Sequence, residues 1–169
     1  FDARFSALGR SYAYRVSDRP EPLGRWDRLW VEDALDEAAM NEAGAALLGE
    51  HDFLGFCRPR EGATTIRTLR TLRAERDTEG TLVFRVEADA FCHSMVRSLV
   101  GALLLVGQRA RDIDYPARIL RARSRSEAAP IAPAHGLTLE GVEYPDPSQW
   151  GARAEQARAR RDACCGDDS

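Results

Sequence analysis

One stretch, AFCHSMVRSLVGALLLVG from Ala90 to Gly107, limits the possible folds of this chain more than any other. It predicts a largely buried helix with an arginine in its middle. Its apolar side chains cover most of the circumference of a helix over 91–106: Phe91, Cys92, Met95, Val96, Leu99, Val100, Leu103 and Val106. An ionised guanidinium is costly to bury without an opposite charge, so Arg97 predicts an acidic partner. The small residues Ser94 and Gly101 leave room beside it for a carboxylate that accepts two hydrogen bonds.

Two kinds of partner for Arg97 remain open at this point. One is a structural ion pair with an acid of the same chain, for which Asp89 is the nearest candidate. The other is a carboxylate that docks against the helix as part of a functional site. In either case the guanidinium would lower the pKa of the carboxylate and keep it ionised.

The rest of the chain alternates between strand-like and helix-like spacing. Period-two alternation predicts strands over 12–17, 65–77, 82–90 and 137–145, with the TEG tripeptide as the turn of a central hairpin. Helical spacing predicts helices over 36–48, with Gly49 as its cap, and over 91–106 and 115–123. The order β-α-β-β-α-(α)-β predicts an α+β, ferredoxin-like or RNP-like fold, in which helices cover one face of an antiparallel sheet. Such folds place nucleotides on the open face.

Length and composition predict one soluble domain. The 169 residues suffice for a single core, and we expect a domain over 1–145 followed by a flexible tail over 146–169. The sequence has no apolar run long enough for a membrane span and no export signal, which predicts a cytoplasmic protein without membrane contact. The chain starts at Phe1 rather than at methionine, which suggests a fragment or a processed chain.

The net charge of −3 conceals an acidic and a basic region. From Leu29 to Cys57 there is no arginine, and the acids are Glu32, Asp33, Asp36, Glu37, Glu42, Glu50 and Asp52. The segment from Arg58 to Arg76 carries six arginines, at positions 58, 60, 67, 70, 73 and 76. Such a patch can hold a phosphate backbone, although a solvated strand face is the alternative.

The cysteines predict neither a metal site nor a disulfide framework. They stand at Cys57, Cys92, Cys164 and Cys165, without C-x-x-C spacing and with only three histidines in the chain. Since disulfides are rare in cytosolic proteins, Cys57 and Cys92 are interpreted as small packing residues.

Two further stretches carry candidate binding residues. FDARFSALGRSYAYRV interleaves aromatic rings with Arg4 and Arg10, as a site for a flipped nucleotide requires, although Tyr12 and Tyr14 would also fit one buried strand face. In APAHGLTLEGVEYP, Gly136 either lets backbone approach a ligand or forms a plain turn.

Together these stretches resemble the TruA family of tRNA pseudouridine synthases. The similarity covers about residues 1–145, and its motifs are FDARFSALGRSYAYRV, GEHDFLGF, TIRTL, EADAFCHSMVRSLVGALLLVG and APAHGLTLEGVEYP. The F-x-x-x-M-V-R-x-x-V-G run that contains Arg97 is the most specific of them.

The resemblance implies an enzyme that converts uridine to pseudouridine in the anticodon arm of tRNA without a metal or an organic cofactor. It further implies a homodimer, with each active site in a cleft between two halves that have RNP-like sheets. The family's nucleophile is an aspartate in an Arg-Thr-Asp stretch, and this sequence contains no such tripeptide. The half with the nucleophile is therefore missing here, and we expect the fragment alone to be inactive.

The resemblance also implies roles for individual residues. Arg97 matches the guanidinium that holds the catalytic aspartate across the cleft, which takes precedence over the pair with Asp89. Tyr12 matches a tyrosine that stacks on the target base, and Gly136 and Leu137 match the lining of the same pocket. The segments FDARF and 58–64 match tRNA-contacting stretches, which makes the following residues RNA-binding candidates: Phe1, Arg4, Phe5, Arg10, Arg58 and Arg60.

Two functions from other classes compete with this interpretation. The sheet and its arginines would also suit a noncatalytic RNA-binding module. Alternatively, the apolar long helix would suit a dimerisation domain.

Overall fold

The computed structural model describes residues 3–4, 6–153 and 155–156. Phe1 and Phe5, two of the RNA-binding candidates, lie outside the described residues, as do Cys164 and Cys165. None of the described helices is long and apolar enough to cross a membrane.

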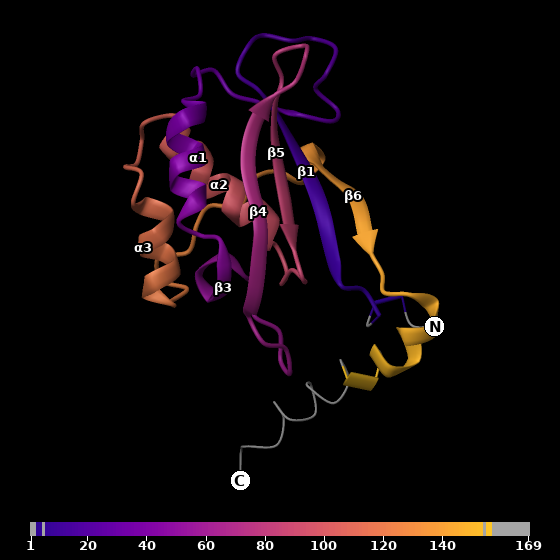
Figure 1. Cartoon of the computed structure of the whole chain (residues 1–169). Coiled ribbons are helices and arrows are strands. Elements are labelled where there is room, and N and C mark those ends of the chain that lie inside the picture. Colours follow the sequence, from indigo (N-terminus) through magenta and orange to yellow (C-terminus); the bar gives the residue numbers. More distant parts are fainter. Residues whose placement is uncertain (1–2, 5, 154, 157–169) are drawn as a thin grey trace.

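One six-stranded sheet organises the chain (Figure 1). Its strands are β1 (Gly9–Ser17), β2 (Leu29–Trp30), β3 (Gly49–Asp52), β4 (Ile66–Arg76), β5 (Leu82–Ala88) and β6 (Leu137–Glu143). The order across the sheet is β2-β1-β5-β4-β3, and β6 pairs with β1 on the same edge as β2. All pairs are antiparallel except β1 with β2, so the predicted α+β fold with a central β4–β5 hairpin is confirmed.

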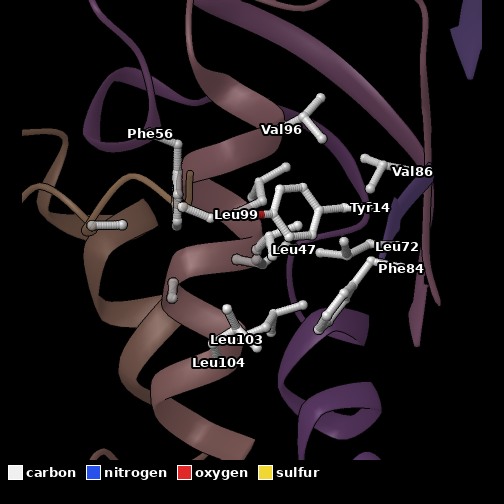
Figure 2. Close-up of a cluster of buried hydrophobic side chains, with 14 of the residues drawn as sticks. Tyr14, Leu47, Phe56, Leu72, Phe84, Val86, Val96, Leu99, Leu103 and Leu104 are labelled. Atoms are coloured by element: carbon white, nitrogen blue, oxygen red, sulfur yellow. The ribbon is translucent and has the colours of Figure 1, made fainter. Parts of the chain in front are cut away.

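Three helices lie on one side of this sheet in Figure 1. They are α1 (Glu37–Ala45), α2 (Met95–Gly107) and α3 (Tyr115–Ala122), and short 3₁₀ helices cover Leu54–Phe56, Ala134–Gly136 and Pro147–Gln149. The core lies between helices and sheet, where Tyr14, Phe84 and Leu103 are almost completely buried. In Figure 2 the ring of Tyr14 points from the sheet toward Leu99 on α2.

The opposite face of the sheet is open and carries ion pairs. Arg85 on β5 binds Glu75 of β4 at 2.6 Å and Glu140 of β6 at 2.9 Å. Arg15 on β1 also binds Glu140, at 3.3 Å. Arg15 and Arg85 on this face therefore already have acidic partners within the chain.

Strand β6 is an edge strand. It pairs with β1 from Tyr14↔Leu137 to Gly9↔Glu143, and none of the described strands pairs with its other side. A shift of register between Ser11 and Tyr12 marks a bulge in this pairing.

The long helix begins later than its sequence pattern predicts. The pattern starts at Phe91, whereas α2 starts at Met95, because Ser94 adopts a left-handed conformation with φ of 65°. Residues 91–94 therefore form a connection from β5, and Phe91 is free to point away from the helix axis. The first helix differs as well, since its C-cap is Ala46 and Gly49, with φ of 101°, begins β3.

Cys57 and Cys92 pack in or against the core as predicted, but the expectation that they form no disulfide is wrong, because the two residues are bonded to each other. The Arg58 N–H donates to the carbonyl of His93 at 2.9 Å, in an isolated antiparallel bridge. This bridge brings the two cysteines to a Cα–Cα distance of 5.6 Å, which suits a disulfide. Two segments that are 35 residues apart in sequence are thus joined covalently.

The first described residues of the predicted flexible tail, from 146 to 153, form a 3₁₀ helix and a hydrogen bond to Pro145. After the 3₁₀ helix at Pro147–Gln149, the Trp150 Nε1–H donates to the carbonyl of Pro145 at 2.8 Å. The domain boundary at residue 145 stays a prediction.

Candidate active site

Arg97 lies in the first turn of α2 and is partly buried. Its Nε donates to the carbonyl oxygen of Ala132 at 2.6 Å, and the Ala132 N–H donates back to the carbonyl of Arg97 at 3.0 Å. One turn later, a Cβ at Gly101 would collide with the carbonyl of Pro130. The small residues on this side of α2 therefore accommodate the backbone of 130–132, a use of the space that the sequence did not indicate.

No acid among the described residues is an ion-pair partner of Arg97, since none comes within 4.0 Å of its guanidinium. The alternative pair with Asp89 is wrong, because Asp89 Oδ1 accepts the N–H groups of Thr68, at 2.9 Å, and Ala90, at 2.7 Å. Within the same described part of the chain, only Nε of the Arg97 side chain is hydrogen-bonded. The two terminal nitrogens can thus receive a carboxylate end-on through a pair of parallel hydrogen bonds.

Tyr14 connects this helix to the sheet. Its buried hydroxyl donates to the carbonyl of Pro133 at 2.7 Å, next to the Ala132 contact of Arg97. Burial raises the pKa of Tyr14 to about 12, and the positive charge of Arg97 opposes this rise. Tyr14 is therefore a neutral structural donor at physiological pH.

Gly136 lets the backbone of its own segment lie close to β1 of the same chain, not to a ligand. A Cβ at this position would lie 2.8 Å from Cζ of Tyr14 and 3.0 Å from the carbonyl oxygen of Arg15. The glycine thus lets the 130–136 segment pass over β1 and places Leu137 directly opposite Tyr14 in the sheet.

Tyr12 lies two residues before Tyr14 on the same, helix-covered face of β1. Its ring meets Phe91 edge-on at a centroid distance of 5.2 Å, and it stands opposite Leu139 of β6. Tyr12, Phe91 and Leu137 are only partly buried and Leu139 is 51% exposed, so a base has apolar surface to lie against. Where nucleotides lie relative to the open face of the sheet stays a prediction.

Sequence reasoning missed Phe91 and Leu139 as members of this cluster. Phe91 was counted as part of the helical stripe, from which Ser94 separates it. Leu139 carried a usable signal, because period-two spacing from Leu137 places both leucines on one face of β6.

The described RNA-binding candidates gather at one end of the sheet. There β1 begins and β5 and β6 end, as the pairs Arg10↔Ala88 and Gly9↔Glu143 show. Arg10 donates to the carbonyl of Arg4 at 3.1 Å. Arg58 and Arg60 are exposed and belong to the loop that leads into β4 from the same end.

The basic region predicted from Arg58 to Arg76 is not one patch. Arg70 lies at the end just described and binds Glu143 at 2.9 Å, whereas Arg76 lies at the opposite end of β4 and binds Asp18 at 2.6 Å. The Arg76 hydrogen bond holds the pKa of Asp18 at about 2. At the end of the sheet where Arg70 lies, the exposed Arg58 and Arg60 have no ion pair in the described part of the chain and therefore suit a phosphate backbone better than Arg70 does.

In the described part of the chain, no three or more His, Cys, Asp or Glu side chains lie close enough together to hold a metal ion.

Comparison with known proteins agrees with this geometry. A sequence model of the family described as tRNA pseudouridine synthase matches residues 43–145. The chain is 56% identical over 164 residues to tRNA pseudouridine synthase A of Frankia casuarinae, covering 95% of this chain and 60% of the relative. It is 52% identical to the protein of the same name from Streptomyces griseus, covering 98% of this chain and 61% of the relative. The matching protein from Mycobacterium leprae is 47% identical, with coverage of 95% and 57%.

These matches span nearly the whole chain but only about 60% of the length of the relatives. The family model covers the β3–β6 part of the fold, including Arg97 and Leu137. The chain therefore belongs to the tRNA pseudouridine synthase family.

Proposed function

We propose that this chain is the C-terminal part of an enzyme that isomerises uridine to pseudouridine in the anticodon arm of tRNA. In this proposal it supplies RNA-binding and supporting residues, and the nucleophilic aspartate comes from polypeptide N-terminal to Phe1. The observation that carries the proposal is the partly buried Arg97, whose terminal nitrogens lack an acidic partner among the described residues.

Arg97 is suited to hold a carboxylate that must attack. Its Nε is fixed by Ala132, so the guanidinium is already oriented before an acid arrives. A carboxylate bound end-on would be kept ionised, because the neighbouring positive charge lowers its pKa. Its lone pairs would then be directed at the substrate.

Tyr12 is suited to support the base. Removing a uridine from its stack costs a few kcal/mol, which apolar contacts with the extruded base offset. The Tyr12–Phe91 pair offers such contacts on the helix-covered face, and Leu137 and Leu139 extend them along β6.

The chemistry is an isomerisation in which no atom is gained or lost. The aspartate attacks the sugar or the base, the N1–C1′ bond breaks, the uracil turns, and C5 forms the new bond to C1′ while the bond to the aspartate is released. C5 then loses its proton and N1 acquires one. Arg97 and Tyr12 organise these steps, but neither side chain provides the attacking group.

The dimer and the absence of an organic cofactor are proposed on the same family resemblance, and the cytoplasmic location is proposed on the sequence pattern described above. A light-scattering mass of one chain at micromolar concentration would argue against dimerisation through this part of the enzyme.

The test measures tritium release from tRNA labelled at C5 of uridine. We expect background release from the 169-residue chain and clear release from a chimera that carries the N-terminal part of the Frankia casuarinae relative ahead of Phe1. Release above background by the chain alone would show that the nucleophile is misplaced. A chimera that folds and binds tRNA without turnover would instead favour a noncatalytic RNA-binding module.

A further inference from the structure

His93 lies just before α2, where this segment meets the loop that contains Arg58 and Arg60. Its carbonyl accepts the Arg58 N–H at 2.9 Å, and the disulfide between Cys57 and Cys92 holds the two segments together beside it. The imidazole is exposed, and Nδ1 lies 3.3 Å from Nη2 of Arg60.

The contact with Arg60 indicates which ring nitrogen of His93 carries the proton. A guanidinium only donates hydrogen bonds, so in this contact Nδ1 of His93 accepts and the ring N–H is at Nε2. The Nε2–H is then a second donor on an exposed ring, and it has no hydrogen-bond acceptor among the described residues.

The cluster of Arg58, Arg60 and His93 has no internal counter-charge. None of the three has an acidic partner within 4.0 Å in the described part of the chain, whereas Arg70, Arg76 and Arg85 each have one. Two exposed guanidinium groups and one N–H donor on adjacent segments suit an anion with several acceptor oxygens.

We propose that His93 Nε2–H and the guanidinium groups of Arg58 and Arg60 bind one phosphate of the RNA backbone beside the candidate active site. The inference rests on the proposed function and adds His93 to its binding residues. His93 follows Phe91, the ring partner of Tyr12, by two residues and precedes Arg97 by four. A phosphate held here would therefore lie close to the nucleotide that Tyr12 supports.

Three variants of His93 separate direct binding from a purely positioning role. His93→Gln places an amide N–H near the position of Nε2, whereas His93→Asn retains an acceptor near Nδ1 and loses the outer donor. With tRNA binding to the 169-residue chain measured by filter retention, we expect His93→Ala and His93→Asn to weaken binding about tenfold. His93→Gln should stay within about threefold of the wild type.

The reverse order would overturn the proposal. If His93→Asn binds like the wild type and His93→Gln like His93→Ala, the ring only positions Arg60. Equal binding by all three variants would overturn it as well. Urea unfolding of each variant keeps a loss of fold apart from a loss of binding, and His51→Ala is the matched control, because the His51 ring contacts the carbonyl of Leu48 instead.

The salt dependence of tRNA binding distinguishes the His93 N–H donor from the guanidinium cations of Arg58 and Arg60. Each phosphate contact by a cation contributes about 0.7 to the slope of log affinity against log salt for single strands. Arg60→Gln should therefore lower the slope by about this amount, while His93→Gln leaves it unchanged. Equal slopes for wild type and Arg60→Gln would contradict a phosphate at this cluster.

Failure of the proposed function has a different signature. A wild-type chain that binds tRNA no better than an unrelated acidic protein overturns both proposals. A wild-type chain that binds tRNA with the same affinity as His93→Ala overturns only the role of His93. Inorganic phosphate serves as the second probe, and binding of it as tight as that of tRNA would point to a free anion instead of the RNA backbone.

Discussion

Arg97 and Ala132 hydrogen-bond to each other twice, once through the guanidinium Nε and once through the backbone N–H of Ala132. This reciprocal contact explains how a charged side chain is tolerated in an apolar helix without an acid of the described chain. It also leaves the end of the guanidinium available, on which the proposed function depends.

Arg97→Lys should abolish most turnover of the chimera while the protein still folds. An ammonium group cannot reproduce both the Nε contact with Ala132 and a two-pronged contact with a carboxylate, so we expect kcat to fall about 100-fold. Tritium release and urea unfolding measure the two effects separately. Arg109→Lys is the control, because Arg109 binds Asp36 at 3.4 Å just beyond the opposite end of α2. Near wild-type turnover in Arg97→Lys would exclude the proposed role.

Tyr12→Ala should reduce turnover of the chimera with little change in its affinity for tRNA. Stacking on one base is worth about 1–3 kcal/mol, and it acts only on the extruded uridine, whereas the arginines hold the backbone. We therefore expect kcat to fall about 10- to 100-fold and the dissociation constant to change less than about twofold. Parallel loss of both would favour the RNA-binding module. Tyr115→Ala, which removes a ring packed beside Arg111, is the control.

Asp18→Asn should lower stability in a pH-dependent manner. Asp18 has a pKa of about 2 because Arg76 donates hydrogen bonds to it, compared with an ordinary value of 3.8. A lowered pKa means that the ion pair contributes fully above pH 3.8 and that its contribution is lost as the pH falls toward 2. The substitution should cost about 2 kcal/mol at pH 7, and wild type and variant should converge as the pH falls through about 2.

Urea unfolding at several pH values measures this difference. Glu42→Gln on the exposed side of α1 is the matched control and should show no comparable pH dependence. A constant difference between wild type and Asp18→Asn from pH 7 to pH 3 would contradict the assignment.

Removing the disulfide should destabilise the chain. Cys57 and Cys92 are 35 residues apart, and closing a loop of this size reduces the entropy of the unfolded chain by an amount worth about 3–4 kcal/mol. The double variant Cys57→Ser and Cys92→Ser should unfold at lower urea than the oxidised wild type. Dithiothreitol should bring the wild type to the same midpoint without affecting the variant. No effect of the reductant on the wild type would show that the two thiols are unlinked in solution.

Gly136→Ala should also be destabilising, although its φ is not in the left-handed region. The added methyl group would meet the Tyr14 ring at 2.8 Å, and backbone shifts of this kind cost about 1–3 kcal/mol. Gly151→Ala is the control, since a Cβ there has no neighbour within 4 Å. Equal unfolding midpoints for the two variants would mean that the segment over β1 can move away without cost.

Local patterns in the sequence account for most of the fold. The β4–β5 hairpin is predictable because two strand-like segments flank a short turn, although the register shifts between Leu69 and Thr71 in β4. Asp36 caps α1 by accepting the Ala39 N–H at 3.0 Å, as such residues do. The apolar character of α2 follows from its spacing. The predicted start of α2 was wrong, because Ser94 adopts a left-handed conformation. The strands β2 and β3 were not predicted, because their two and four residues are too few for a periodic signal.

The site was predictable in its residue types and less so in its contacts. The cost of burying Arg97 predicts that it needs a partner, yet the carbonyl of Ala132 lies 35 residues away and gives no local signal. The Cys57–Cys92 bond depends on the Arg58↔His93 bridge, which is also a long-range pairing. Such contacts arise from how separate segments pack, and spacing within one segment does not encode them.

The unpaired side of β6 has a consequence for handling this chain. Its outward N–H and C=O groups form a row that another strand can extend, and Leu139 adds apolar surface beside them. Concentrated samples of these residues alone should tend to associate through this edge, because arginines of the same chain bind Glu140 and Glu143 and so weaken the charge repulsion that protects edge strands. The solubility of the chain at high concentration therefore reports whether another segment of polypeptide covers the unpaired edge of β6.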